Sequence, residues 1–137
     1  MKKGNAFKFG DNISTDHIAP GRLFHLRSDL KEFSKHVLED ADPNFASSMK
    51  VGDFVVAGNN FGLGSSREHA PQIIKIAGVG AVIAKSFARI FYRNAINIGL
   101  LAIECDTDGI DAGDELDLDI KAGILKNITK GTTTMIE

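Results

Sequence analysis

The 137-residue sequence has a single cysteine and no tryptophan. That one cysteine, Cys105, cannot close a disulfide within the chain, and it cannot by itself hold a zinc ion or an iron–sulfur cluster. It ends the apolar run LLAIEC, a setting in which a free cysteine usually packs as a small buried side chain. We therefore expect this chain to bind no metal.

Neither sign of charge dominates the sequence, and it has no long apolar run. The chain carries 16 lysines and arginines against 18 aspartates and glutamates, for a formal net charge of -2. A nucleic-acid-binding surface would need a basic excess, and a membrane span would need about 20 apolar residues in a row. The opening MKKGNAFKFG also lacks the apolar segment of a secretory signal. We expect a cytoplasmic protein with neither a nucleic-acid nor a membrane partner.

Strand-like and helix-like segments alternate in the middle of the chain. Short β-branched runs predict buried strands, and helical spacing that ends at a glycine predicts helices between them. A further helix is expected to begin with Ser28 as its N-cap, and the tail after residue 113 alternates as antiparallel strands do. The expected central elements are strands at 54–58, 81–86 and 100–105 and helices at 67–78 and 86–99. The pattern predicts one α/β domain with a mixed sheet over residues 1–137.

Acidic residues alternate with apolar ones in the segment DELDLDI. The pattern of Asp114, Glu115, Asp117 and Asp119 is typical of the exposed face of an edge strand, where charged side chains discourage pairing with other chains. A calcium site is the alternative that the same carboxylates suggest. We favour the exposed face.

Three glycines, two serines and an arginine occur in the stretch GNNFGLGSSREHAP, residues 58–71. Gly62 and Gly64 allow tight turns and close backbone approach. The helix expected after them has unpaired N–H groups at its start, and Ser65, Ser66 and Arg67 can add hydroxyl and guanidinium donors. The stretch therefore predicts a site for a small anionic ligand. A serine-capped helix after a glycine turn is the simpler alternative.

Common nucleotide-binding and hydrolase motifs do not fit this loop. It lacks the Gly-Lys pair followed by Ser or Thr of a P-loop, and Arg67 breaks the spacing of a dinucleotide fingerprint. A hydrolase nucleophile elbow would need a glycine two positions after Ser65, where Arg67 stands. A serine made basic by arginine and backbone N–H donors remains open.

Three segments together closely resemble one known family. GNNFGLGSSREHAP, AVIAKSFARIFYRNAINIGL and DNISTDHIAPGR are similar to small subunits of the isopropylmalate isomerase and homoaconitase group, which correspond to the swivelling fourth domain of aconitase. The resemblance implies a swivelling β/β/α domain with a mixed sheet. It also implies a large partner subunit that carries a 4Fe-4S cluster. The implied reaction is a hydro-lyase isomerisation, in which dehydration and rehydration move a hydroxyl group, and the chain alone would be inactive.

The resemblance also implies roles for individual residues. Ser65 matches the family's catalytic serine, which as an alkoxide removes the proton next to a carboxylate. Ser66 and Arg67 match residues that bind the substrate carboxylate, and Asp16 and His17 match an Asp-His pair that lines the same pocket. Proton abstraction beside a carboxylate needs a base and a stabilising positive charge, and the Ser-Ser-Arg run supplies both.

The side group of the substrate stays open at this point. Arg27 matches a second carboxylate-binding arginine of aconitases and an arginine in the specificity loop of homoaconitase small subunits, whereas isopropylmalate enzymes tend to be apolar there. We expect an isopropylmalate-type hydroxy acid of leucine biosynthesis, because that is the commonest activity of such chains. The alternative within this family is the small subunit of a homoaconitase, of an aconitase-like enzyme or of a substituted-malate hydratase. The alternative outside enzymes is a non-catalytic module that binds an anion.

Overall fold

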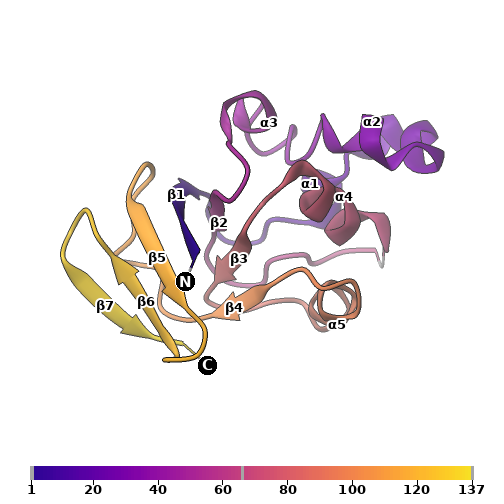
Figure 1. Ribbon diagram of the computed structural model, residues 1–137. Helices are drawn as coiled ribbons and strands as arrows, with labels where there is room; N and C mark the ends of the chain where they lie inside the picture. Colours follow the sequence, from indigo (N-terminus) through magenta and orange to yellow (C-terminus); the bar gives the residue numbers. More distant parts are fainter. Residues whose placement is uncertain (1, 66, 137) are drawn as a thin grey trace.

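The computed structural model describes residues 2–65 and 67–136. Its strands join in one seven-stranded sheet, in the order β4-β3-β2-β1-β5-β6-β7 (Figure 1). The strands are β1 (Lys2–Lys8), β2 (Phe54–Val56), β3 (Ala81–Ala84), β4 (Ala102–Glu104), β5 (Glu115–Asp119), β6 (Ile124–Asn127) and β7 (Thr132–Met135). The helices are α1 (Thr15–Ile18), α2 (Leu30–Ser34), α3 (Phe45–Ser48), α4 (His69–Ala77) and α5 (Arg89–Asn97), with a 3-10 segment at Gly21–Ser28.

The sheet has a parallel half and an antiparallel half, which meet at β1. β1 pairs in parallel with β2 on one side and antiparallel with β5 on the other. Every residue of β2 and of β3 is buried, so these strands are continuous apolar runs rather than alternating ones. Such runs are typical of parallel strands that are covered on both faces.

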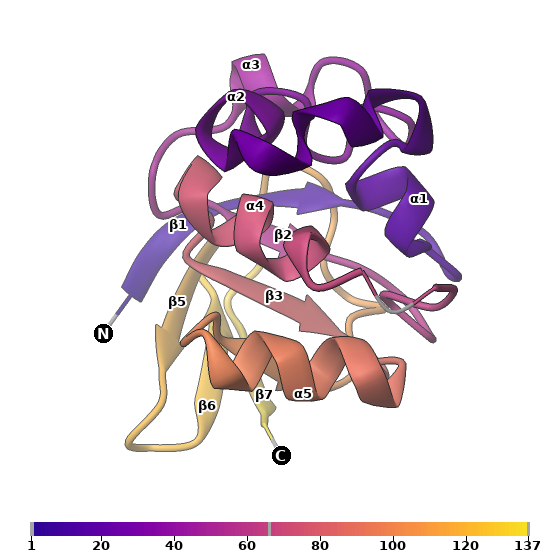
Figure 2. The same ribbon diagram turned by 90° about the vertical axis from the view of Figure 1, so that its right-hand side faces the viewer.

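The two faces of the parallel strands enter two different cores. Val55 faces the helices and shares a core with Phe91 of α5. Phe54 faces the other way and packs with Leu118 of β5. The antiparallel strands therefore cover one face and the helices the other, as the two ribbon views show (Figures 1 and 2). The expected β/β/α arrangement with a mixed sheet is confirmed.

The helices end where glycine was expected to end them, but the N-cap of α2 is not the residue that was expected. Gly78 follows α4 in the left-handed conformation, with φ of 98°. The N-cap of α2 is Asp29, whose side chain accepts a hydrogen bond from the N–H of Glu32, so the expectation of Ser28 is wrong by one residue. Asp29 takes this place because Ser28 still belongs to the preceding 3-10 segment. No helix in the described part of the chain is long and apolar enough to cross a membrane.

The acidic segment is not the exposed face of an edge strand. β5 lies inside the sheet, between β1 and β6, and Asp114 and Asp117 are each only 5% exposed. Asp114 accepts a 2.8 Å hydrogen bond from Nδ2 of Asn127. This bond, followed by the backbone N–H of Asp111 and the ammonium of Lys130, holds the pKa of Asp114 below its usual value. The expectation failed because alternation within one segment does not show which strand pairs beside it.

Candidate functional site

The glycine-rich loop between β2 and α4 is held on both sides by backbone hydrogen bonds. On one side, the N–H of Gly62 donates to the carbonyl of Ile13 at 2.7 Å, and the N–H of Thr15 donates to the carbonyl of Leu63 at 2.8 Å. On the other, the N–H of Phe61 donates to the carbonyl of Ser86 at 3.0 Å. The loop therefore lies between the segment that leads into α1 and the segment that leads into α5.

Gly62 is a position in this loop where only glycine fits. Its φ is 88°, a left-handed value that other residues adopt with strain. A Cβ built there would also overlap the ring of Phe91 on α5. The backbone of Gly62 therefore lies close to an aromatic side chain of the same chain.

Ser65 is exposed, and it lies before the start of α4 rather than at it. The helix begins at His69, and the side chain of its N-cap residue, Glu68, makes no capping hydrogen bond with a described residue. Ser65 is therefore not the N-cap of this helix, and the other serine of the loop, Ser66, lies outside the described residues. The position of Ser65 depends instead on α1, because Oγ1 of buried Thr15 donates to the Ser65 carbonyl at 3.0 Å.

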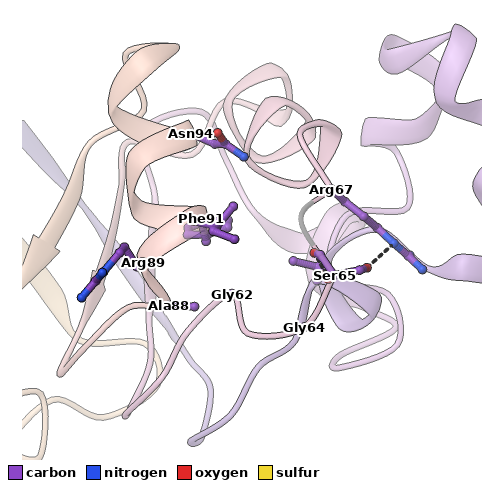
Figure 3. Close-up of a pocket in the computed structure, with 10 residues that line it drawn as sticks. Gly62, Gly64, Ser65, Arg67, Ala88, Arg89, Phe91 and Asn94 are labelled. Atoms are coloured by element: carbon purple, nitrogen blue, oxygen red, sulfur yellow. Dashed lines mark hydrogen bonds between the residues drawn. The ribbon is translucent and has the colours of Figure 1, made fainter.

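The side chain of Arg67 turns back onto Ser65. Its Nε donates to Oγ of Ser65 at 3.1 Å, as the dashed line in Figure 3 shows. Its Nη1 lies 2.7 Å from Oδ1 of Asp16 and donates to the carbonyl of Ala19 at 2.9 Å. Three partners therefore fix the guanidinium before any ligand arrives, and a fixed cation beside a hydroxyl oxygen stabilises negative charge on it.

A cavity of about 210 Å³ opens beside Ser65. In Figure 3, Ser65 and Arg67 lie on one side of it, and side chains of α5 lie on the other. Ile90 and Phe91 provide an apolar wall, and Arg89 and Asn94 add polar groups. The described residues that line the cavity are Thr15, Gly62, Gly64, Ser65, Arg67, Ala88, Arg89, Ile90, Phe91 and Asn94.

Several of these lining residues were not identified from the sequence. Thr15 stands next to the predicted Asp16, but nothing in its own position reveals a bond to Ser65 fifty residues away. Ile90 and Asn94 are four apart on α5, so they share a side of that helix, and this spacing was the available signal. What the spacing could not show is that this side of the helix faces the loop.

The predicted site residues are only partly brought together. Ser65, Arg67 and Asp16 form one cluster with Gly62 and Gly64 beside it, and Ser66 lies outside the described residues. His17 turns back onto its own helix, where its Nδ1 accepts a 2.9 Å bond from the N–H of Ser14. It lines a separate hollow with Lys8 and Asp40, so the structure does not place it in the Ser65 cavity.

Arg27 also lies away from the cavity. Its Nη1 donates to the carbonyl of Phe24 at 3.1 Å, and its guanidinium carbon lies 4.4 Å from the centre of the Phe24 ring. The guanidinium carbon of Arg67 lies 5.8 Å from the same ring. Both arginines thus lie near the Phe24 ring, but the described cavity residues include only Arg67 of the two.

His69 lies close to both Arg67 and Arg27. Its ring stacks on Phe33, with the ring centres 5.4 Å apart, and it also contacts the Phe24 ring. Its Nε2 is buried without a hydrogen-bond partner among the described residues. Burial, and then the positive charges of Arg67 and Arg27, lower the pKa of His69, while Glu68 opposes them. A neutral imidazole therefore supports the arginines without adding a third positive charge.

Comparison with known proteins shows the family of this chain. Residues 26–108 match the aconitase C-terminal domain family. The chain is 66% identical over 128 residues to 3-isopropylmalate dehydratase small subunit 2 of Archaeoglobus fulgidus, an alignment that covers 93% of this chain and 78% of the relative. This chain belongs to the aconitase C-terminal domain family.

Further relatives place the chain more narrowly within the aconitase C-terminal domain family. It is 65% identical to 3-isopropylmalate dehydratase small subunit 1 of Thermotoga maritima, over 96% of this chain and 80% of the relative. A crystal structure of 3-isopropylmalate dehydratase from Methanocaldococcus jannaschii superposes with a TM-score of 0.94 at 49% identity, covering 98% of this chain and 80% of that one. Aconitase X of Thermococcus kodakaraensis, at 14% identity and a TM-score of 0.54, shares the fold alone.

An iron–sulfur cluster, which this enzyme family uses, does not fit the residues of this chain. Cys105 is its one cysteine, and it is buried. Burial, followed by the charge of Asp106, raises the pKa of its thiol to about 11, whereas cluster iron binds the thiolate. Across residues 2–65 and 67–136, no three His, Cys, Asp or Glu side chains are grouped closely enough to hold a metal ion. The described chain therefore offers no set of ligands for a cluster.

Proposed function

We propose that this chain is the small subunit of a 3-isopropylmalate dehydratase, a hydro-lyase that isomerises its hydroxy-acid substrate by dehydration and rehydration. Its relatives with 54–66% identity carry that name. The observation that carries the proposal is the 3.1 Å bond from Nε of Arg67 to Oγ of Ser65, at the mouth of a cavity large enough for part of a small acid. This is the arrangement that the removal of a proton next to a carboxylate requires.

In this proposal Ser65 is the base. Loss of its hydroxyl proton leaves a negative oxygen, which the hydrogen bond from Arg67 stabilises. Asp16 and the Ala19 carbonyl hold the guanidinium in place, so it need not reorganise as charge develops. The alkoxide takes the proton from the carbon next to a carboxylate as hydroxide leaves the neighbouring carbon. Ser65 returns that proton when hydroxide adds back in the new orientation.

The apolar wall of the cavity supports the isopropyl side group. Ile90 and Phe91 can pack against a branched alkyl chain. A third carboxylate against Ile90 and Phe91 would need a cation of its own, because an unpaired buried charge is costly. Arg89 also lines the cavity, but its side chain points away from Phe91 and Ser65 (Figure 3). Arg27, the residue that would favour a tricarboxylate, is held on Phe24 instead. This arrangement favours isopropylmalate over homocitrate.

We assign the cluster to a large partner subunit. The relatives are named small subunits, and a small subunit implies a larger one. Since the described residues offer no cluster ligands, the reaction step assigned to this chain is the proton transfer at Ser65. We further propose that residues 1–137 act as one swivelling domain, which brings Ser65 to the partner.

The test is reconstitution without oxygen. The chain is mixed with the large subunit that co-purifies with it, and formation of the unsaturated acid is followed from isopropylmalate and, separately, from homocitrate. We expect turnover of isopropylmalate, reduced by at least about 100-fold in the Ser65→Ala variant because a general base is lost. Full turnover by Ser65→Ala would contradict the proposed base and favour a non-catalytic anion-binding module. Turnover of homocitrate alone would overturn the substrate assignment.

A further inference from the structure

We propose that the outward side of α5 is the surface on which the large subunit docks, and that the partner meets its arginines with acidic side chains and its isoleucines with apolar ones. This inference rests on the proposed function, since it names the partner surface of the same site. The surface consists of Arg89, Ile90, Arg93 and Ile96, and it is called the α5 face below. All four side chains are exposed.

The α5 face is the side of the helix that this chain leaves uncovered. Phe91 and Ala95 are buried against the core. Arg89, Arg93 and Ile96 follow one another at spacings of four and three residues, so they share the opposite side of the helix. Ile96 is 52% exposed. A large exposed apolar side chain one turn from arginines is typical of protein interfaces, in which arginine and apolar residues are enriched.

The arginines of the α5 face lack partners in the described chain. Arg22 pairs with Glu39, and Arg67 pairs with Asp16. Arg89 and Arg93, by contrast, form neither an ion pair nor a side-chain hydrogen bond with any described residue. The helix sequence RIFYRNAIN has no acidic residue that could pair with them four positions away. A partner surface that carries carboxylates would complement this charge.

The α5 face is continuous with the rim of the Ser65 cavity. Arg89, Ile90 and Asn94 line that cavity, and Arg93 and Ile96 lie on the next turns of the same helix. The cavity volume of about 210 Å³ is below the range of about 300–1,000 Å³ usual for a ligand site. The cavity of this chain alone is therefore smaller than a usual ligand site. A partner that closed it would contact the α5 residues on its rim.

A second copy of this chain fits the α5 face poorly. In a symmetric pair the same surface meets itself, so the arginines of one copy would approach those of the other. Like charges brought together in this way oppose association. A large subunit with carboxylates is therefore the occupant that the charge pattern favours.

Another part of the molecule supplies a matched control. Lys126 lies in β6 and Ile128 directly follows it. In Figure 1 the antiparallel strands lie on the left and α5 lies on the right. Lys126 is exposed, and Ile128 is 45% exposed, close to the 52% of Ile96. The pair thus offers the same kinds of side chain at a distance from the site.

The test compares two double variants of the full chain. Arg93→Glu with Ile96→Ser alters the α5 face without changing a residue that lines the cavity. Lys126→Glu with Ile128→Ser is the control. Binding of each to the purified large subunit is measured by calorimetry or sedimentation at low and high salt. Melting of each variant alone shows that it is folded, since exposed substitutions change stability little.

We expect the Kd of the α5 variant to rise by at least about 30-fold, while the control stays within about 3-fold of the wild type. The affinity of the wild type should fall with salt more steeply than that of the α5 variant. Salt screens the ion pairs that Arg93 forms with the partner, and the variant lacks these pairs. Equal binding by all three proteins would overturn the α5 proposal, as would a folded α5 variant whose only defect is in self-association.

The Ser65→Ala variant separates failure of this inference from failure of the proposed function. It should bind the large subunit as the wild type does, since Ser65 is not on the α5 face. If the α5 variant binds normally while Ser65→Ala still abolishes turnover, the docking surface is wrong and the proposed function stands. If the wild-type chain itself does not bind the large subunit, both proposals are overturned.

Discussion

Arg67 donates its Nε hydrogen to Oγ of Ser65 at 3.1 Å, although the two residues are only two positions apart. Neighbours at this spacing in a helix face different directions, so the contact requires that the loop has not yet become helical. The start of α4 at His69 meets that requirement. The exposed segment before the helix is what allows serine and arginine to act as a pair.

Replacing Arg67 with lysine tests this pair. A lysine ammonium cannot reach Ser65, Asp16 and the Ala19 carbonyl together, as the guanidinium does. We expect kcat of the reconstituted enzyme to fall by about 100- to 1,000-fold, the usual effect of removing one fixed donor to a developing anion. The Asp16→Asn variant keeps an oxygen acceptor for Arg67, and its kcat should fall by less than about 10-fold. Equal losses in the two variants would show that Asp16 does more than position Arg67.

Replacing Arg27 with leucine tests the substrate assignment. Since Arg27 is held on Phe24 and is not among the described cavity residues, we expect the KM for isopropylmalate to change by less than about 3-fold, as for a surface substitution. Discrimination against homocitrate should also be unchanged. Both are measured by steady-state kinetics with each acid. A variant that lost activity toward a tricarboxylate alone would instead place Arg27 in the site.

Replacing Gly62 with alanine tests the close approach of the loop to α5. The left-handed φ of 88° strains any side chain, and the new methyl group would overlap the Phe91 ring. We expect a loss of about 3 kcal/mol in the free energy of unfolding, from backbone strain and overpacking together. Urea titration measures this loss.

Gly123→Ala is the control for the Gly62 prediction. Gly123 has φ of 69°, but a Cβ there would meet nothing within 4 Å. Only the backbone strain should then lower the free energy of unfolding, by about 1 kcal/mol. If both variants lost the same stability, the Phe91 contact would have no part in holding the loop.

The pKa of His69 predicts a pH dependence of stability. Burial and the charges of Arg67 and Arg27 lower this pKa in the folded protein, so the unfolded chain binds a proton more readily. Folding stability therefore falls as pH drops through about 6.5, the unfolded value, and His69 has no effect well above it. In urea titrations at pH 7.5 and 5.5, the wild type should lose more stability than His69→Gln. Equal losses would indicate that His69 titrates normally.

The main elements of the fold could be predicted because their signals are local. A run such as FVVAG or AVIA is apolar at every position, which indicates a strand covered on both faces. Gly78 ends its helix as expected, because only glycine readily takes the left-handed turn. The N-cap at Asp29 was missed by one residue, since an aspartate and a serine side by side are equally good caps.

The sequence by itself determined the alternation of elements, the loop that must approach closely, and the Ser-Ser-Arg run, because each depends on neighbours along the chain. The tertiary structure alone decided which of the candidate residues meet. It pairs Arg67 with Asp16, turns His17 away, holds Arg27 on Phe24 and buries Asp117 between two strands. These outcomes depend on packing between segments far apart in sequence, and side-chain spacing within one segment carries no information about what packs beside it.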